Sequence, residues 1–559
     1  MPTTDTTDAR AIRELAARTI GIADLRPGQE RAIREVATGR DTLVVMPTGY
    51  GKSAVYQIAG HLIDGPTVVV SPLIALQLDQ LRQVAEAPGA HAAVAINSGG
   101  TEADRRQGWE SLRAGDAEFL FLAPEQFGVP EVVERLGALE VGLFVVDEAH
   151  CVSAWGHDFR PDYLRLGAVI EALGSPTVLA LTATGSAPVR EEIVDRLGMR
   201  DACVLVGGFD RPNLHLEVVR HETKEEKDAA VLEEAMQAAH PGLVYVATRA
   251  QAERMADALG ERGLRAAHYH GGLSARRRAA VQDDFQADRL DVVVATNAFG
   301  MGIDKPNVRF VLHGDVPESL DAYAQETGRA GRDGDPASVV LHYRPEDLGL
   351  RRLFSAGRPD PDRVRRVAAA LTDATDPVSV RDLARAADVP TRSAGAIANL
   401  LVEAGFARDD RAHVVADASI DAEAADAAVD ELIGRRRRVA ESRLAMIRGY
   451  AETRRCRRMV LLEYFGDDPG APCGNCDTCD SGAATVVHGE SEAEAAAGSS
   501  GGPGRSGAFD VDEQVRHAEW GEGRVMSVEV DRITVFFGDE GYRVLALDAV
   551  ERGGLLARV

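Results

Sequence analysis

A glycine-rich segment at residues 47–53 (PTGYGKS) has the residue types and spacing that bind a nucleotide phosphate chain. Its glycines let backbone N–H groups turn toward phosphate oxygens, and a helix that begins directly afterwards adds its positive end. Lys52 would reach the β- and γ-phosphates, and the Ser53 hydroxyl would hold Mg²⁺. A simple glycine turn between a strand and a helix is the alternative for this motif taken alone.

An acid pair farther along the chain supplies the other half of this chemistry. Asp147 and Glu148 open the segment DEAH, which ends at His150. Asp147 would hold Mg²⁺ through water, and Glu148 would orient and deprotonate the water that attacks the γ-phosphate. An exposed acidic turn is the alternative, but it does not account for a matching phosphate loop upstream. The two segments together predict a nucleoside triphosphatase.

Buried strands should position both segments. The apolar run 43–46 precedes the phosphate loop, and the run 141–146 ends at the acid pair. Ligands bind at the carboxyl ends of parallel strands, so both segments lie where an active site is expected. Further apolar runs that end in polar loops, with helical stretches between them, lie at 67–73, 117–125 and 177–184. This alternation predicts a doubly wound parallel α/β domain over residues 1–208.

The same architecture restarts near residue 212 and predicts a second α/β domain over residues 209–355. Its expected strands lie at 242–249, 290–304 and 307–317. A helix that carries QETGRAGRDG would place Arg329 and Arg332 on one face. Across a cleft from the first domain, these arginines would stabilise γ-phosphate charge, and surface ion pairing is the alternative. Two such domains around a nucleotide make a motor, because hydrolysis opens and closes the cleft.

Composition bounds the class of protein. The net charge of −25, from 63 bases and 88 acids, argues against broad polyanion binding, although local basic stripes decide a nucleic-acid footprint. No stretch approaches the ~18 apolar residues of a membrane span, and the polar N-terminus carries no signal core. We therefore expect a cytoplasmic protein without a disulfide framework, although the chain has six cysteines.

Taken in order, these motifs carry a family resemblance. Residues 22–345 resemble RecQ-type superfamily 2 DNA helicases in LRPGQE, PTGYGKS, SPLIALQLDQ, APEQ, DEAH, LTAT, GFDRPN, HYHGGLS, ATNAFGMGIDKP and QETGRAGRDG. The resemblance implies two tandem RecA-like domains and an ATP-dependent 3′→5′ DNA helicase of repair and recombination in a bacterial cytoplasm. It also implies nucleotide contacts by the adenine-recognition motif and the phosphate loop: Arg26, Gln29, Thr48, Gly49, Gly51, Lys52 and Ser53.

The chain departs from this family at two positions. Leu25 stands where the family usually has an aromatic residue, which would weaken stacking on the nucleotide base. Tyr50 replaces the middle glycine of the family's GGGKS and puts a bulky ring beside the phosphate loop, with an effect on rate that the sequence leaves open.

The segment that follows the acid pair, CVSAWGHDFRP, resembles the aromatic-rich loop with which RecQ proteins sense single-stranded DNA. Aromatic faces stack on unpaired bases for about 1–3 kcal/mol each without demanding a sequence. Their proximity to Glu148 would let DNA binding act on the catalytic acid. Core packing is the alternative, but the polar residues between the aromatics argue against burial. The predicted DNA contacts are Trp155, His157, Phe159 and Arg160.

Two small modules should follow the motor. Apolar spacing over residues 361–415 suits a winged helix or a plain helical spacer. Residues 421–480 are rich in arginine and contain four cysteines that suit tetrahedral Zn²⁺ and resemble the RecQ zinc-binding platform, with an iron–sulfur cluster as the alternative. The expected zinc ligands are Cys456, Cys473, Cys476 and Cys479.

The C-terminus should hold a tethered module. Residues 481–510 are rich in Gly, Ser, Ala and Glu and predict a flexible linker. Residues 511–559 alternate apolar and polar positions between glycine turns, as a small β-barrel does, and resemble the Tudor-like tail of UvrD-type helicases. We expect the tether to leave the orientation of this module open and the module to recruit a protein partner, with RNA polymerase suggested by analogy.

These motifs are compatible with three functions. The leading hypothesis is a helicase that acts on single-stranded and partly duplex DNA with ATP, Mg²⁺ and Zn²⁺. The alternatives are an ATP-driven translocase that remodels protein–DNA complexes and a DNA-docking scaffold. The sequence determines neither the preferred DNA structure nor the oligomeric state.

Overall fold

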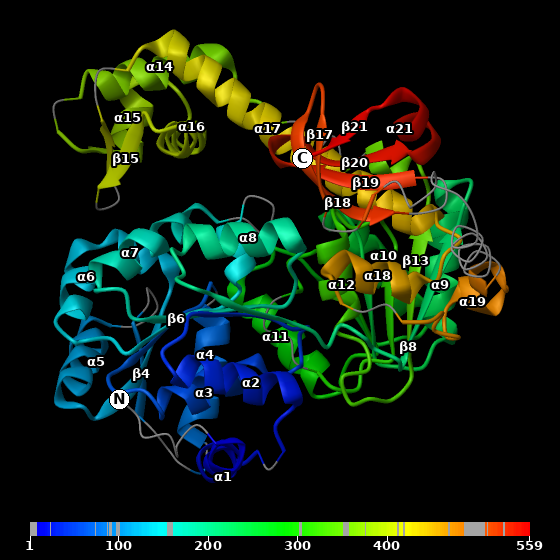
Figure 1. Ribbon diagram of the computed structural model, residues 1–559, viewed down its shortest axis with the longest axis horizontal. Helices are drawn as coiled ribbons and strands as arrows, with labels where there is room; N and C mark the ends of the chain where they lie inside the picture. Colours follow the sequence, from blue (N-terminus) through cyan, green and yellow to red (C-terminus); the bar gives the residue numbers. More distant parts are fainter. Residues whose placement is uncertain are drawn as a thin grey trace.

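The computed structural model describes residues 8–559 apart from several segments, most of them short. The segments outside this description are 23, 73, 87, 89–91, 97–100, 154–159, 301–304, 350, 352–356, 375, 411–412, 418–419, 468–469, 486–508, 511–512 and 529–531. Two α/β domains form the body of the molecule, and smaller units follow them in the chain (Figure 1).

The first domain is built on a seven-stranded parallel sheet with the strand order β3-β4-β2-β5-β6-β1-β7. Its strands are β1 (Thr42–Val45), β2 (Thr67–Val70), β3 (Ala92–Ile96), β4 (Ala117–Leu122), β5 (Leu143–Val146), β6 (Thr177–Thr182) and β7 (Cys203–Val206). Alternate residues of one strand enter two separate cores. Leu43 and Val45 pack on one face and Val44 on the other, which explains why the strands are continuously apolar.

Helices cover both faces of this sheet (Figure 1). They are α1 (Ala9–Thr19), α2 (Pro27–Ala37), α3 (Lys52–Gly60), α4 (Ile74–Glu86), α5 (Glu102–Ala114), α6 (Pro130–Gly137), α7 (Leu166–Ala172) and α8 (Ala187–Arg196). Three 3₁₀ segments connect them: η1 (Pro124–Gly128), η2 (Ala149–Val152) and η3 (Pro161–Arg165).

The second domain repeats the plan with a six-stranded parallel sheet of order β10-β11-β9-β12-β13-β8. Its strands are β8 (Leu214–Arg220), β9 (Gly242–Tyr245), β10 (Ala266–Tyr269), β11 (Val292–Ala295), β12 (Phe310–His313) and β13 (Ala337–Tyr343). Its helices are α9 (Lys224–Gln237), α10 (Arg249–Glu261), α11 (Ala275–Gln286) and α12 (Leu320–Thr327). The prediction of two tandem parallel-sheet domains is confirmed.

One local expectation in the second domain was wrong. Helix α12 ends at Thr327, so Arg329 and Arg332 lie in the turn that follows and not on a helix face. The chain does not resume helical geometry at Gly331, which lies between the two arginines. Gly331 has a φ of 54°, and a Cβ there would lie 2.5 Å from the Asn213 side chain, so neither helical geometry nor a larger residue fits.

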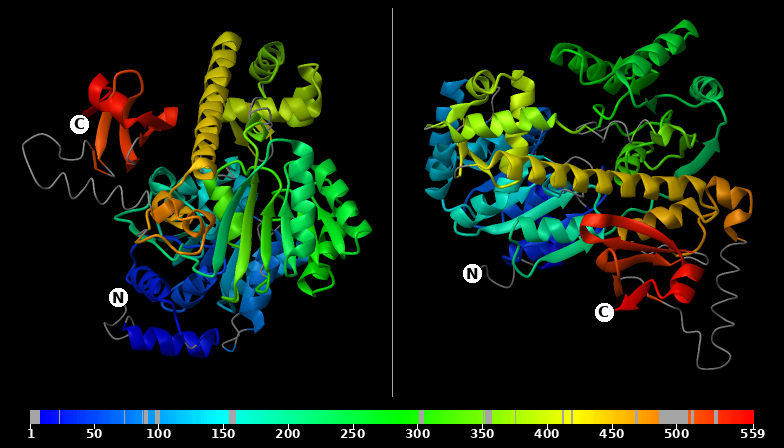
Figure 2. Two further views of the ribbon diagram at one scale, coloured as in Figure 1. Left: turned by 90° about the vertical axis from the view of Figure 1, so that its right-hand side faces the viewer. Right: turned by 90° about the horizontal axis from the view of Figure 1, so that it is seen from above.

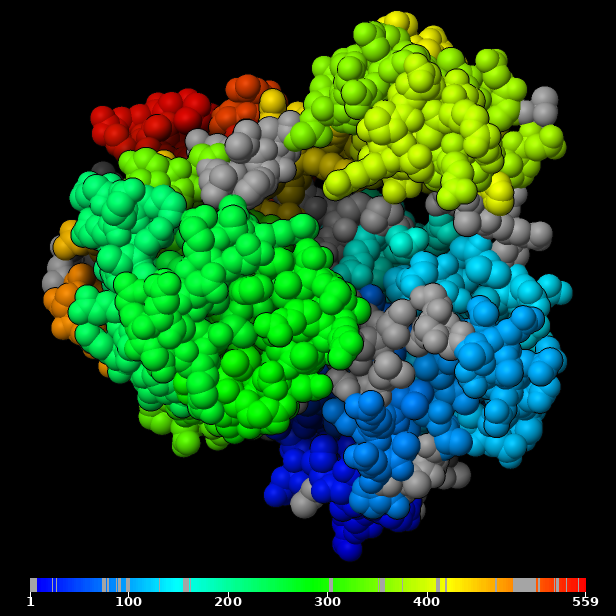
Figure 3. All heavy atoms as spheres, turned by 180° about the vertical axis from the view of Figure 1, so that it is seen from behind, coloured from blue at the N-terminus to red at the C-terminus, as the bar shows by residue number. Residues whose placement is uncertain are grey.

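A separate small module of helices and strands follows the second domain. It combines α14 (Pro361–Thr372), α15 (Val380–Ala386) and α16 (Thr391–Glu403) with a three-stranded antiparallel sheet of order β14-β16-β15. The strands are β14 (Val378–Ser379), β15 (Ala407–Asp410) and β16 (His413–Ala416). Figure 3 shows this yellow-green module above the first domain, with the green second domain beside them.

One long helix, α17 (Ala422–Glu452), spans the distance from this module to the second domain (Figure 2). Two shorter helices, α18 (Arg457–Phe465) and α19 (Asp477–Asp480), complete the cysteine-containing unit. Residues Leu444, Ile447 and Tyr450 of α17 belong to the same hydrophobic core as the second sheet. The cysteine-containing unit is therefore an extension of the second domain.

The C-terminal residues form a five-stranded antiparallel sheet of order β20-β19-β18-β17-β21. Its elements are β17 (Gln514–His517), β18 (Gly521–Val528), β19 (Arg532–Phe537), η4 (Gly538–Glu540), β20 (Gly541–Ala546), α21 (Leu547–Gly553) and β21 (Leu556–Arg558). Side-chain contacts join this sheet to α8, α17 and α18, so its orientation is set, contrary to our expectation of a freely oriented tethered module. Among the described helices, none has the length and apolar content needed to cross a bilayer.

A buried group of ions ties the second domain together. Lys227 of α9 is fully buried, and its Nζ donates hydrogen bonds to Asp315 Oδ1 at 2.7 Å and to Asp347 Oδ2 at 2.6 Å. Asp315 also accepts the backbone N–H of Ala247, which follows β9. The lysine thus compensates the charge of two carboxylates that follow different strands.

We expect Lys227→Ala to destabilise the second domain by about 3 kcal/mol, because removing one partner of a buried ion group leaves uncompensated charge. Lys224→Ala on the same helix is the matched control, since Lys224 forms only a partly exposed pair with Asp228. Urea unfolding measures the free energy of unfolding of each variant. Hydrogen exchange in α9, β9 and β12 then shows whether the loss of stability lies in the second domain. Equal rates of hydrogen exchange in Lys227→Ala and Lys224→Ala would contradict a stabilising role of Lys227.

Candidate nucleotide and zinc sites

The phosphate loop joins β1 to α3 in the conformation that its glycines permit. Gly49 and Gly51 have φ values of 80° and 83°, a region that other residues rarely adopt. Gly51 is the N-cap of α3, so the helix N-terminus points at the loop. Lys52 Nζ donates to the carbonyl oxygen of Met46 at 2.8 Å, and desolvation lowers the pKa of this lysine.

The acid pair lies at the carboxyl end of β5, close enough to Lys52 for their charges to interact. Asp147 is 7% exposed, and its Oδ2 accepts a hydrogen bond from Gln80 Nε2 at 3.1 Å. Burial and the neighbouring Glu148 carboxylate raise the pKa of Asp147 above its ordinary value. A cation between these oxygens would reverse that effect, which suits the expected Mg²⁺ site.

His150 links the acid pair to the next strand. Its Nδ1 lies 3.3 Å from Glu148 Oε2 and 3.0 Å from the Thr182 hydroxyl at the end of β6. Burial lowers the pKa of His150 to about 3, so the ring is neutral at physiological pH. Glu148 itself has a φ of 49°, in the left-handed region. The histidine therefore lies between Glu148 and the end of β6.

Gln29 and Arg26 of the adenine-recognition motif contact the phosphate loop directly. Gln29 is buried, and its Nε2 donates to the carbonyl oxygens of Tyr50 at 3.0 Å and Gly51 at 2.9 Å. Arg26 Nη1 donates to the Gly49 carbonyl at 3.3 Å. Both side chains therefore hold the backbone of the phosphate loop, and their contact with a nucleotide stays a prediction.

Tyr50 fills space between the loop and the segment that joins the two domains. The Arg26 guanidinium lies 4.6 Å from the centre of its ring. On the Gly208 side, a Cβ added at that glycine would lie 2.5 Å from the ring, so only glycine permits this contact. The unusual residue of the phosphate loop thus packs against the interdomain connection.

Arg332 brings the second domain to the same loop. A Cβ added at Gly49 would lie 3.2 Å from Arg332 Cδ, which places the arginine side chain against the phosphate loop. Arg329 is 2% exposed, and within the described residues its Nε and Nη1 have no hydrogen-bond partner. A buried cation whose donors lack partners suits an anionic ligand.

The described residues include only part of the predicted DNA-sensing loop. Arg160 Nη1 donates to the carbonyl oxygen of Pro72 at 3.1 Å, which connects the end of the loop to the segment after β2. Trp155, His157 and Phe159 lie outside the described residues, so their role stays a prediction.

Four cysteine sulfurs converge in the predicted zinc module. All four ligand atoms of Cys456, Cys473, Cys476 and Cys479 lie within 4.8 Å of one another, and two sulfur pairs are 3.9 and 4.0 Å apart. Tetrahedral zinc with its usual bonds to sulfur requires sulfurs about 3.8 Å apart. The set therefore fits one zinc ion.

Residues that the sequence reading did not single out hold this module in place. Arg457 is buried and forms a two-pronged ion pair with Asp477, whose Oδ2 also accepts the backbone N–H of Val218 in β8. Phe209 of the interdomain segment stacks on Phe465 at 4.5 Å between ring centres, a contact worth about 1 kcal/mol. The arginine cluster around Cys456 was the available signal, but sequence alone did not show which member would be buried.

Comparisons with known proteins agree with this geometry. Three family descriptions match the chain: DEAD/DEAH box helicase at residues 26–192, helicase conserved C-terminal domain at 226–334 and RecQ zinc-binding at 420–480. The ATP-dependent DNA helicase RecQ of Haemophilus influenzae is 34% identical over 460 residues, which are 82% of this chain and 62% of the relative. In both helicase domains and in the zinc-binding unit, the chain is similar to RecQ helicases.

Another relative and a solved structure extend this comparison. The probable ATP-dependent DNA helicase RecS of Bacillus subtilis is 40% identical over 332 residues, which are 59% of this chain and 66% of that protein. The alignments therefore span less than two thirds of these relatives' own length. The crystal structure of the DUF1998 helicase MrfA bound to DNA and AMPPNP matches with a TM-score of 0.52 at 18% identity, covering 63% of this chain and 52% of MrfA, which shows the shared fold.

We expect the purified protein to contain one zinc per chain and Cys476→Ser to lose it, because three thiolates bind zinc far more weakly than four. The same variant should increase hydrogen exchange in α18 and α19. Cys203→Ser is the control, since Cys203 is a buried residue of β7 in the other domain. Metal analysis decides the outcome, and an iron chromophore or an unchanged zinc content in Cys476→Ser would contradict the assignment.

Proposed function

We propose that the protein is an ATP-dependent 3′→5′ DNA helicase that unwinds duplex DNA in repair and recombination. One observation carries this proposal: Arg332 of the second domain lies against the phosphate loop of the first, opposite Lys52 and the acid pair. A nucleotide site that needs both domains makes hydrolysis depend on their relative position. The similarity to ATP-dependent DNA helicases of the RecQ type supports DNA as the substrate.

The side chains divide the work of hydrolysis. Lys52 and the N–H groups of the phosphate loop would hold the β- and γ-phosphates, with Thr48, Gly49 and Gly51 in that loop. Glu148, positioned by neutral His150, would accept a proton from the attacking water. Ser53 and Asp147 would hold Mg²⁺, which neutralises phosphate charge when bound. Arg329 and Arg332 would stabilise charge on the γ-phosphate, and Arg26 and Gln29 would contact the base.

DNA would reach the site through two surfaces. The loop with Trp155, His157, Phe159 and Arg160 would stack on unpaired bases and pass their presence to Glu148. We interpret the module of α14–α16 with its three-stranded sheet as a winged helix that meets duplex DNA. The α17 helix would keep it at a set distance from the motor.

The C-terminal sheet and the setting of the protein complete this proposal. We interpret the five strands as a Tudor-like barrel with a protein-docking role, and recruitment of RNA polymerase stays a hypothesis by analogy. A bacterial cytoplasm is the setting in which RecQ-type repair of DNA would take place.

We expect Lys52→Ala and Glu148→Gln to lower the ATP turnover number by several orders of magnitude, because they remove the phosphate clamp and the acid that orients water. Arg332→Ala should lower turnover strongly while ATP binding persists. Lys224→Ala serves as the control for loss of a lysine. Steady-state hydrolysis with and without single-stranded DNA measures these effects, and near-normal turnover in Lys52→Ala would end the motor interpretation.

Strand-displacement assays then separate the three functions on the wild-type protein. A helicase of the proposed polarity separates a duplex with a 3′ tail but not one with a 5′ tail. A translocase hydrolyses ATP and displaces a bound protein with little strand separation. A scaffold binds DNA without hydrolysis, which would overturn the proposal.

We expect Trp155→Ala to retain ATP binding and basal hydrolysis but to lose most of the stimulation by single-stranded DNA, since the stacking platform is removed. Trp109→Phe is a conservative control, because Trp109 is buried in the first domain at α5. Stimulation at the wild-type level in Trp155→Ala would show that the loop is structural only.

A further inference from the structure

The C-terminal sheet contacts the first domain at the start of α8. Tyr542 of β20 donates a hydrogen bond from its hydroxyl to Ser186 Oγ at 2.7 Å. Ser186 is the N-cap of α8 and is 1% exposed, while Tyr542 is 5% exposed. One turn into α8, Glu191 forms an ion pair with Arg524 of β18. Two polar contacts therefore join the sheet to one helix of the first domain.

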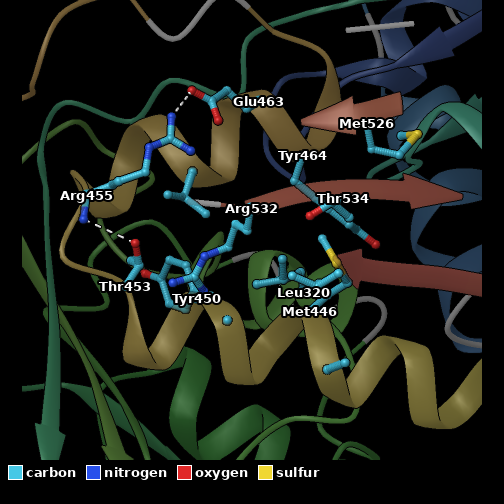
Figure 4. Close-up of a pocket in the computed structure, with 14 residues that line it drawn as sticks. Leu320, Met446, Tyr450, Thr453, Arg455, Glu463, Tyr464, Met526, Arg532 and Thr534 are labelled. Carbon is cyan, nitrogen blue, oxygen red and sulfur yellow. Dashed lines mark hydrogen bonds and ion pairs between the residues drawn. The ribbon is translucent and has the colours of Figure 1, made fainter. Parts of the chain in front are cut away.

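The other side of the sheet packs on α17 and α18 through apolar groups. The Tyr542 ring lies 6.2 Å from the Tyr464 ring of α18, and both belong to the core of the second domain. Arg438 of α17 adds an ion pair with Glu540 at 3.1 Å. Figure 4 shows Met446 and Tyr464 facing Met526 and Thr534 across a cavity of about 70 Å³ between the helices and the strands.

Helices α17 and α18 are in turn bound to the second domain. Tyr464 donates from its hydroxyl to Asp321 Oδ2 of α12 at 2.5 Å. The hydroxyls of Tyr323 and Tyr450 lie 3.1 Å apart, which joins α12 to α17. The sheet is therefore attached on one side to a unit that moves with the second domain and on the other side to the first domain.

These two attachments differ in kind. The attachment to α17 and α18 is largely apolar and buried, so it is costly to open. The attachment to α8 consists of one buried hydrogen bond, whose net contribution to stability is modest, and one ion pair whose side chains are 30% and 58% exposed, and exposed pairs are weak. A solvent-open groove of about 740 Å³, lined by α8 residues and Arg524, continues beside this contact. The contact with α8 is the one that can open and close.

We propose that the C-terminal sheet is a releasable strap between the two α/β domains. The sheet remains packed on α17 and α18 and binds α8 reversibly. It thereby favours the arrangement in which Arg332 lies against the phosphate loop. The effect on ATP use rests on the proposed function, whereas the strap contact itself does not.

Charge reversal across the strap tests this proposal on the full-length, zinc-containing protein. Arg524→Glu places a carboxylate opposite Glu191 and should release the strap, and Glu191→Arg combined with Arg524→Glu should restore it. Tyr542→Phe removes only the hydroxyl that reaches Ser186. Arg516→Glu is the control, because Arg516 lies on the same sheet and pairs with exposed Glu522 of that sheet instead of with α8.

Hydrogen exchange tests the contact between the sheet and α8, and the kinetics of ATP hydrolysis test its effect on the nucleotide site. Hydrogen exchange without nucleotide should rise several-fold in α8 for Arg524→Glu and Tyr542→Phe, with β18–β20 still protected by α17. The KM for ATP should rise several-fold with a smaller change in kcat, since the released cleft is less often closed. The double variant should return both values toward wild type, and Arg516→Glu should change neither.

Unchanged exchange in α8 would overturn the strap contact. Raised exchange with an unchanged KM would overturn its influence on the cleft. If the wild-type protein hydrolyses no ATP, the proposed function fails, and hydrogen exchange still decides whether the strap exists.

Discussion

The nucleotide site depends on one geometric constraint, which is that a parallel sheet gathers the carboxyl ends of its strands at one edge. Strands β1, β5 and β6 end in the phosphate loop, the acid pair and Thr182, and these segments meet there although the chain separates them widely. The arrangement places Lys52, Asp147 and Glu148 in one electrostatic environment. Charges brought together in this way interact strongly, which is why the site needs a cation and a polyanion to balance them.

A single sheet cannot complete the site, and the second domain supplies what is missing. Arg332 reaches the phosphate loop from a turn in which Gly331 adopts a φ of 54°. The connection between the domains also takes part, because Tyr50 packs on Gly208 while the next residue, Phe209, stacks on Phe465 of the zinc module. A change in the shape of the phosphate loop would therefore alter the packing of the interdomain connection and of the zinc module.

The zinc module and the C-terminal sheet extend this coupling. Arg190 of α8 donates to the Phe465 carbonyl oxygen at 2.8 Å, next to the contact between Tyr542 and Ser186. Helix α8 of the first domain thus meets two units that are anchored on the second. Because apolar burial holds one side and polar pairs the other, relative movement of the domains would be concentrated at α8. This division of contacts is the physical basis of the proposed strap.

The residue pattern alone was sufficient for several features. Strands β1, β2, β5 and β9 were predictable because buried parallel strands are continuously apolar, and the cysteine spacing was sufficient for the zinc set. Strands β3, β8 and β13 were not identified, since β3 is mostly alanine and β8 and β13 contain polar residues, and such runs resemble other elements until neighbouring strands pair with them. Local sequence patterns indicate the structure of the neighbouring residues only, whereas these strands form by pairing with strands that are distant in the sequence.

The sequence by itself determined the chemistry: which side chains can hold phosphate, activate water and bind zinc, and where along the chain they lie. Only the tertiary structure decided how they are combined. It placed Arg332 on the phosphate loop, moved Arg329 and Arg332 from a helix face to a turn, and set the C-terminal sheet against α8. The physical reason is that motif residues follow local backbone and side-chain rules, whereas contacts between domains depend on the shape and burial of surfaces that no single segment contains.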